Sequence, residues 1–180
     1  MNYIGKILVF GFAGYTGYAC MTALPAIAID HPKYVFESKV ISAPLKTVWQ
    51  AVKAQKTNDP EHRRVISTNG PVSVVEEKFR HIPVLGTVTC QYSQLEFSDN
   101  KLKYKMISSD KFVAFEGEWE LKQMADGQTS VKLSSFVDSG LKLPFADKIT
   151  RANTKRSVTA RLSEIEQWVN NDKKSRLAAK

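Results

Sequence analysis

The sequence predicts an α+β domain in which a curved antiparallel sheet of seven strands wraps around one long C-terminal helix. Two observations carry this prediction. From Arg63 onward, segments of alternating apolar and polar residues are separated by turn residues, as is typical of antiparallel strands. After Gly140 the period changes, and the stretch from Pro144 to Val169 repeats apolar residues at three- and four-residue steps without another Pro or Gly. Sheet and helix each have one apolar side, so we expect these sides to be buried against each other.

The composition indicates a single globular domain. The chain of 180 residues is 43% hydrophobic and 24% charged, which is enough for a substantial core and excludes disorder of the whole chain. Its net charge of +8 suits an acidic partner, but lysines spread along strands are also typical of a solvated surface. The terminal helix lacks interleaved aromatic and basic residues, so no nucleic-acid partner is predicted. We expect a monomer.

Residues 1–28 are predicted to be a signal peptide. One positive charge precedes an uncharged run from Ile7 to Ala28, which ends in the small residues that signal peptidase requires. Cleavage after Ala28 predicts a periplasmic or secreted protein. The alternative is an uncleaved anchor, which several glycines and threonines disfavour, since a spanning helix needs about 20 strongly apolar residues. The folded domain is then expected at 29–170, with a polar tail at 171–180.

The first elements after this leader are predicted to be a strand and a short helix. The strand at 34–41 alternates, and its inward face is expected to carry Tyr34, Phe36, Ser38 and Val40. An amphipathic helix follows, whose apolar face is Leu45, Val48, Trp49 and Val52. The polar, turn-rich segment 56–62 leaves room for at most one small helix.

The six later strands show clear inward and outward faces. Between Lys101 and Met106 the lysines alternate with apolar residues, and glutamates alternate with apolar residues between Val113 and Leu121. We expect the lysine and glutamate faces to pair across neighbouring strands. Cys90, the only cysteine of the mature chain, falls on the inward face and is predicted to be a buried thiol. Gly117, between two inward aromatic residues, predicts a bend or a close approach.

These features resemble the START-like, or SRPBCC, superfamily, which includes polyketide cyclases and the birch-pollen-allergen fold. The resemblance rests on the order of elements, on the segment from Val40 to Leu45 followed by Val48-Trp49, and on the segment from Gly140 to Pro144 before the last helix. It implies a helix-grip fold with an internal cavity between the sheet and the last helix. Such a cavity would hold an apolar ligand of the lipid, fatty acid, sterol, quinone or polyketide class.

The resemblance predicts non-enzymatic binding or transport of a hydrophobic small molecule. Inward-facing apolar and aromatic residues, with a few hydroxyls, would form the site, although many of them could equally be plain core. The expected ligand-binding residues are Phe36, Ser38, Tyr92, Tyr104, Met106, Phe115, Trp119, Leu133, Phe145 and Ile149. No metal or cofactor is expected, because histidines at ligand spacing, a Cys-x-x-Cys motif and a phosphate-binding glycine loop are all absent from the sequence.

An aromatase- or polyketide-cyclase-like enzyme is the alternative function, because cyclases of this superfamily use sparse polar groups in an apolar cavity. The dense charged strand Glu76, Glu77, Lys78 and Arg80 is able to aim one or two groups inward. The three histidines are predicted to lie at the surface, and no catalytic residue is assigned.

The terminal helix also carries basic residues that are predicted to contact an anionic membrane surface. Lys148, Arg151 and Lys155 recur at three- and four-residue steps beside the apolar face. Arg156 and Arg161 add to the same basic character. The alternative is that these side chains pair with glutamates of the helix or of the strands and only solvate the helix.

Overall fold

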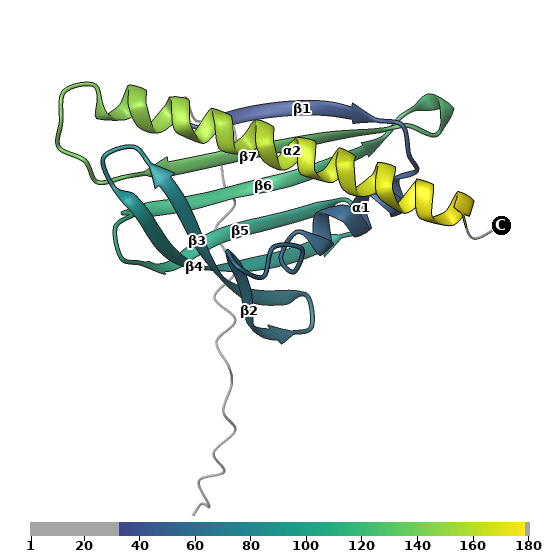
Figure 1. The fold of residues 1–180 in the computed structure, drawn as a ribbon, viewed down its shortest axis with the longest axis horizontal. Helices are drawn as coiled ribbons and strands as arrows, with labels where there is room; N and C mark the ends of the chain where they lie inside the picture. Colours follow the sequence, from purple (N-terminus) through teal and green to yellow (C-terminus); the bar gives the residue numbers. More distant parts are fainter. Residues whose placement is uncertain (1–32, 179–180) are drawn as a thin grey trace, which may run out of the picture.

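The computed structural model describes residues 33–178 of the chain. The predicted signal peptide, residues 1–28, lies outside this range and stays a prediction. Seven strands form one sheet in the order β1-β7-β6-β5-β4-β3-β2, and every neighbouring pair is antiparallel (Figure 1). The strands are β1 Val35–Ile41, β2 Arg63–Asn69, β3 Val72–Ile82, β4 Gly86–Ser98, β5 Lys101–Ser109, β6 Ala114–Gln123 and β7 Thr129–Asp138. The predicted α+β class and seven-stranded antiparallel sheet are confirmed.

The last helix, α2, spans Ala146–Ala178 and runs across the inner face of the sheet (Figure 1). It is longer than predicted: the sequence analysis ended it at Val169 and expected a polar tail at 171–180. The helix continues because no Pro or Gly follows to stop it, and its last turns need no apolar face once they extend beyond the sheet. Its start also differs, since Phe145 has a φ of 65° and precedes the first helical residue.

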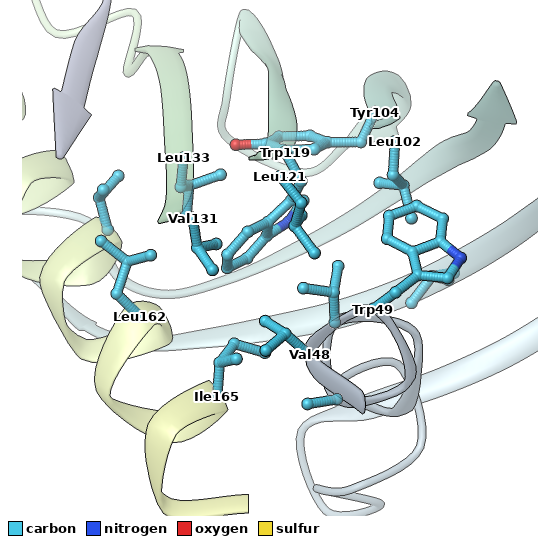
Figure 2. Close-up of a cluster of buried hydrophobic side chains, with 14 of the residues drawn as sticks. Val48, Trp49, Leu102, Tyr104, Trp119, Leu121, Val131, Leu133, Leu162 and Ile165 are labelled. Atoms are coloured by element: carbon cyan, nitrogen blue, oxygen red, sulfur yellow. The ribbon is translucent and has the colours of Figure 1, made fainter. Parts of the chain in front are cut away.

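The short helix α1, Leu45–Ala54, is confirmed, and it covers the end of the sheet that lies under the C-terminal half of α2 (Figure 1). Its buried residues, Val48 and Trp49 among them, meet Leu162 and Ile165 of α2 and the inward side chains of the middle strands (Figure 2). This cluster is the dry core of the domain. Residues 56–62 form turns, and no second small helix is present there.

The inward face of β1 was predicted wrongly. Val35, Glu37 and Lys39 pair in register with Ser135, Leu133 and Val131 of β7, so they share the inner side of the sheet. β1 is the edge strand beside α2, and its charged side chains reach the helix: Lys39 Nζ lies 2.5 Å from Glu166 and Lys155 Nζ lies 3.3 Å from Glu37. The charged side chains on this face of β1 therefore pair with charged side chains of α2.

The outer face of β1 carries the residues that were expected inside. Phe36 is 62% exposed and lies under the ammonium group of Lys132, and Ser38 and Val40 are also exposed. Tyr34 packs against Phe136 on the same outer side and donates a hydrogen bond to Glu116. Alternation located the strand correctly, but an aromatic residue on an edge strand does not by itself identify the buried face.

The predicted pairing of lysines with glutamates is confirmed on the outer face of β5 and β6. Lys101, Lys103 and Lys105 lie opposite Glu120, Glu118 and Glu116 in the sheet register. The carboxylate of Glu118 lies 2.8 Å from Lys101 Nζ and 3.5 Å from Lys103 Nζ. Its side chain is only 2% exposed because the two lysine stems cover it. Cys90 is fully buried, as predicted.

Gly117 creates the space that Tyr104 needs. The two residues are cross-strand partners in β5 and β6, and a Cβ at Gly117 would collide with the Tyr104 ring and with the Ser134 carbonyl of β7. The predicted close approach is confirmed. Without a side chain at this point, the phenol ring lies flat over β6, with its hydroxyl 3.5 Å from the Ser134 carbonyl oxygen.

Gly117→Ala should therefore destabilise the fold by about 1–3 kcal/mol, because neither the backbone of β7 nor the packed ring can move aside easily. Urea denaturation at pH 7 measures the change. Glu120→Ala, at an exposed position of the same strand, is the matched control and should change stability by less than about 0.5 kcal/mol. Equal effects of the two substitutions would contradict the close contact.

Candidate ligand-binding site

A cavity lies between the sheet and the N-terminal half of α2. We call it the inner cavity; its volume is about 50 Å³. Its lining is part apolar and part polar. The apolar lining residues are Phe79, Ile82, Pro83, Phe112, Phe115, Leu133, Val137, Leu141, Ile149 and Val158, and we call the rings among them, with the rings packed on these, the aromatic wall. The polar lining residues, most of them from α2 and β7, are Tyr104, Ser135, Ser139, Thr150, Asn153, Thr154, Ser157 and Arg161.

The aromatic wall is a packed unit. Phe115 lies at its centre, with ring centroids 5.3 Å from Phe79, 5.3 Å from Tyr92, 4.9 Å from Tyr104 and 6.4 Å from Phe112. These rings come from four neighbouring strands and the β5–β6 loop. Mutually packed rings hold one another in place, so this side of the cavity is preformed.

A second cavity, which we call the outer cavity, adjoins the first and has a volume of about 290 Å³. It lies between β1, β7 and the first turns of α2, and Lys33, Asp138, Asp147 and Arg151 make its lining more polar. The two cavities share six lining residues: Ser135, Val137, Ser139, Leu141, Thr150 and Thr154. Part of this shared wall is a hydrogen bond of 2.8 Å between the hydroxyls of Ser139 and Thr150.

A buried ionic cluster closes the inner end of the cavity. The carboxylate of Glu77 on β3 accepts hydrogen bonds from Arg161 of α2 at 2.6 Å, from Arg63 of β2 at 3.0 Å and from the Tyr92 hydroxyl of β4 at 2.8 Å. The Arg63 side chain continues to the Gln55 carbonyl oxygen at 3.1 Å, just beyond α1. Arg161 also stacks over Phe79, with 5.9 Å between its guanidinium carbon and the ring centroid.

The cluster fixes the charge of Glu77. Burial alone would raise its pKa, but attraction by Arg161 and Arg63, with hydrogen bonds from Arg161 and Tyr92, outweighs burial and leaves the pKa below its ordinary value. For Arg161 burial acts to lower the pKa, and the neighbouring Glu77 carboxylate raises it above the ordinary value. Burial raises the pKa of Tyr104 to about 12. The charged pair and the neutral phenol are thus stable states near neutral pH.

The structure places four of the ten expected ligand-binding residues on the inner cavity: Tyr104, Phe115, Leu133 and Ile149. Tyr92 lies directly behind this layer and reaches Glu77 instead. Met106 and Trp119 pack in the core, away from both cavities. The expectations for three residues were wrong: Phe36 and Ser38 lie on the outer face of β1, and Phe145 is 78% exposed outside the helix start.

Arg161 was grouped with the basic residues of the terminal helix, but in the structure its side chain is largely buried, with 12% exposed. Arg161 falls three residues after Val158 and four before Ile165, which are both on the buried stripe of α2. Its spacing therefore placed it on the inner face. The charged strand of β3 was judged correctly, because Glu77 points inward while Lys78 and Arg80 are exposed.

The three residues predicted to contact a membrane are exposed, but two of them have partners within the fold. Lys155 pairs with Glu37 at 3.3 Å, and Arg151 lines the outer cavity with its Nη1 atom 3.5 Å from the Tyr34 carbonyl oxygen. The Lys155–Glu37 ion pair favours the alternative of pairing with glutamates for Lys155, whereas the Arg151 contact is to a backbone carbonyl oxygen. Lys148 points to solvent one turn earlier.

The fold agrees with comparisons to known proteins. A family model described as polyketide cyclase / dehydrase and lipid transport matches residues 35–169. The chain belongs to this family. The comparison with curated proteins gives no match. Within residues 33–178, no helix is long and apolar enough to cross a membrane, and no cluster of three or more His, Cys, Asp or Glu side chains is arranged to hold a metal ion.

Solved structures share the START-like helix-grip fold. TTHA0849 from Thermus thermophilus is 17% identical, with a TM-score of 0.64 and coverage of 77% of this chain and 98% of that one. Zhui aromatase/cyclase from Streptomyces sp. R1128 is 14% identical, with a TM-score of 0.66 and coverage of 76% and 93%. A START superfamily protein from Mycobacterium smegmatis is 13% identical, with a TM-score of 0.63 and coverage of 77% and 97%. These likenesses confirm the fold.

The buried cluster predicts an acid-sensitive stability. The folded-state pKa of Glu77 lies below its ordinary value of 4.5, so its ionised form adds stability that is complete above that pH and declines as the pH falls through the lowered pKa. Glu77→Gln should cost about 3 kcal/mol at pH 7, because it leaves two buried guanidinium groups without a carboxylate. The variant should also lose much of the acid-dependent decline seen in the wild type.

Urea denaturation between pH 7 and pH 3 measures both effects. Glu76→Gln is the matched control, since Glu76 adjoins Glu77 in β3 and pairs with the exposed Arg64 at the surface. We expect this control to retain most of the stability at pH 7 and most of the acid-dependent decline. If both variants behaved alike, the buried cluster would not be the source of the acid sensitivity.

Proposed function

We propose that this protein binds a hydrophobic small molecule in the inner and outer cavities and carries or presents it without changing it chemically. The observation that carries the proposal is the inner cavity, where packed aromatic rings face a row of hydroxyls and one buried guanidinium. An apolar pocket with a few convergent polar groups is the usual form of a small-molecule site. Membership of a family described by both cyclase and lipid transport supports the ligand class.

The volumes of the two cavities limit how a ligand is accommodated. The inner cavity of about 50 Å³ holds only a small fragment, whereas a drug-sized ligand needs roughly 300 Å³ or more. The outer cavity, at about 290 Å³, approaches that size alone. We expect a ligand that occupies both cavities to displace the Ser139–Thr150 hydrogen bond, since both residues line both cavities. This displacement is modest, because one neutral hydrogen bond contributes only about 1 kcal/mol.

The protonation states of the cavity groups support binding over catalysis. A general acid or base works best with a pKa near the operating pH. The shifts here run the other way: the pKa of Tyr104 is raised to about 12, and the pKa of Glu77 is lowered. The cyclase-like alternative is tested in the same samples, since turnover of a polyketide or acyl substrate that is lost in Glu77→Gln would favour an enzyme.

A substitution that fills the inner cavity should abolish binding. Ser157 lines it from α2 and is half-buried, so Ser157→Phe places a ring in the space that the ligand would use. We expect at least a tenfold loss of affinity for a fluorescent fatty acid, measured by fluorescence titration. Ser175→Phe makes the same change at an exposed position of α2 and should bind normally. Equal binding by both variants would contradict the proposed site.

We further propose that one end of the domain contacts an anionic membrane, through loops instead of through the α2 face. Three neighbouring loops border the inner cavity, namely the β3–β4, β5–β6 and β7–α2 loops, which contribute Pro83, Phe112 and Leu141 to its lining. Lys111 Nζ of the β5–β6 loop donates to the Leu85 carbonyl oxygen at 2.7 Å, and the Val113 amide donates to the Asp138 carbonyl oxygen at 2.9 Å. The loops are thus joined into one rim.

This rim exposes apolar and basic side chains, along with the carboxylates of Asp110, Asp138 and Asp147. Its exposed large apolar side chains are Val84, Val113, Leu143 and Phe145. Basic side chains on or beside the same loops, Arg80, Lys111, Lys142 and Lys148, are also exposed. Apolar tips surrounded by lysines suit the headgroup boundary of an anionic bilayer, where each basic group near the surface contributes about 1 kcal/mol. A lipid-like ligand would then pass from the bilayer into the cavity that the rim surrounds.

Replacing Val84, Val113 and Phe145 together by Ser should weaken co-sedimentation with phosphatidylglycerol-containing vesicles by about tenfold or more, since inserted apolar side chains contribute most of the affinity. The matched control replaces Phe36, Ile66 and Phe97 by Ser, which are exposed large apolar residues away from these loops. The control should bind like the wild type. Equal losses in both variants would contradict docking through the rim.

A further inference from the structure

Arg161 is a buried cation on the wall of the inner cavity. Its side chain is 12% exposed and extends from α2 between Phe79 and Glu77. Every other basic residue of α2 between Ala146 and Ser175 is exposed. Burial of a guanidinium is costly unless it is paired and hydrogen-bonded, so the chemistry around this group bears directly on the ligand that the cavity accepts.

The buried cluster contains more positive than negative charge. Two guanidinium groups, Arg63 and Arg161, share the single carboxylate of Glu77, and the three side chains are 9%, 12% and 5% exposed. The nearest further carboxylate, Glu164, lies 3.5 Å from Arg63 and is 48% exposed, so it acts at the surface side of the cluster. Of the two arginines, only Arg161 lines the inner cavity.

The hydrogen bonds distinguish the two arginines. Arg63 donates to Glu77, to the Gln55 carbonyl oxygen and to Glu164. Arg161, by contrast, has one hydrogen-bond acceptor among the described residues, the Oε1 atom of Glu77. A guanidinium has five N–H donors. Arg161 therefore keeps donors for a group in the cavity, and Arg63 has none to offer there because it does not line the cavity.

We infer that the cavity selects apolar molecules that carry a carboxylate, and that this group binds Arg161. The inference rests on the proposed function. A carboxylate accepts two parallel hydrogen bonds from a guanidinium, and the donors of Arg161 that Glu77 does not occupy are able to supply them. It fits the inner cavity of about 50 Å³, while the apolar chain follows the aromatic wall of Phe79, Phe112 and Phe115 toward the outer cavity.

The decisive experiment compares three probes on the wild-type protein: dodecanoic acid, its methyl ester and dodecanol, measured by isothermal titration at pH 7.5. The acid should bind about 10- to 100-fold more tightly than the ester and the alcohol, which corresponds to the contribution of a charge-assisted hydrogen-bonded pair. Equal affinities for the three probes would overturn the inference and leave the proposed function standing. If none of the probes bound, the proposed function would fail as well.

Three variants test whether the preference comes from Arg161. Arg161→Met keeps the volume and leaves Glu77 paired with Arg63, and it should reduce the preference for the acid to less than about threefold. Arg63→Met is the matched control, because it removes the other partner of Glu77 without touching the cavity, and it should keep the wild-type preference. Arg161→Lys should retain part of it. An unchanged preference in Arg161→Met, or an equal loss in Arg63→Met, would overturn the assignment.

Discussion

The carboxylate of Glu77 on β3 is hydrogen-bonded, directly or through Arg63, to four other parts of the domain. Its partners come from β2, β4 and α2, and through Arg63 the cluster also reaches the segment after α1. Burying such a group is costly unless every partner is in place. The cluster therefore sets how α2 lies on the sheet more narrowly than apolar packing does, because apolar contacts tolerate small shifts and hydrogen-bonded ion pairs do not.

The position of Arg161, where α2 meets Glu77, also divides the helix into two halves with different neighbours. Beyond Arg161, Leu162, Ile165 and Val169 are buried against α1 and the middle strands. Before it, the inward side chains include Thr150, Asn153 and Ser157, which line cavities instead of filling a core. One helix thus closes the dry core at one end and covers the ligand site at the other, and Arg161 stands at the boundary.

The sequence predicted the strands and helices well because periodicity and turn residues are local signals. The site was predicted only in part, because the apolar residues of a cavity and of a core follow the same pattern: Trp119 and Leu133 both face inward, yet only Leu133 meets the inner cavity. The errors concern residues whose environment depends on a distant element. Phe36 lies outside because β1 is an edge strand beside α2, which no local pattern reveals. Arg161 was grouped with the basic residues of the helix because of its charge. The position of a residue on a helix determines which way its side chain points, whereas its charge determines only the free-energy cost of burying it there.

The division of α2 has a consequence for ligand exchange. The half beyond Arg161 is held by a dry core, whereas the half before it rests on cavities and on weak contacts such as the Ser139–Thr150 hydrogen bond. Segments with few buried apolar contacts open at a lower free-energy cost than the core does. We therefore expect the first turns of α2 to separate from β7 at a lower free-energy cost than the half that Glu77 and its partners hold. A carboxylate bound at Arg161 would then lie on the part of the helix that stays in place, and the apolar chain would leave or enter through the part that opens.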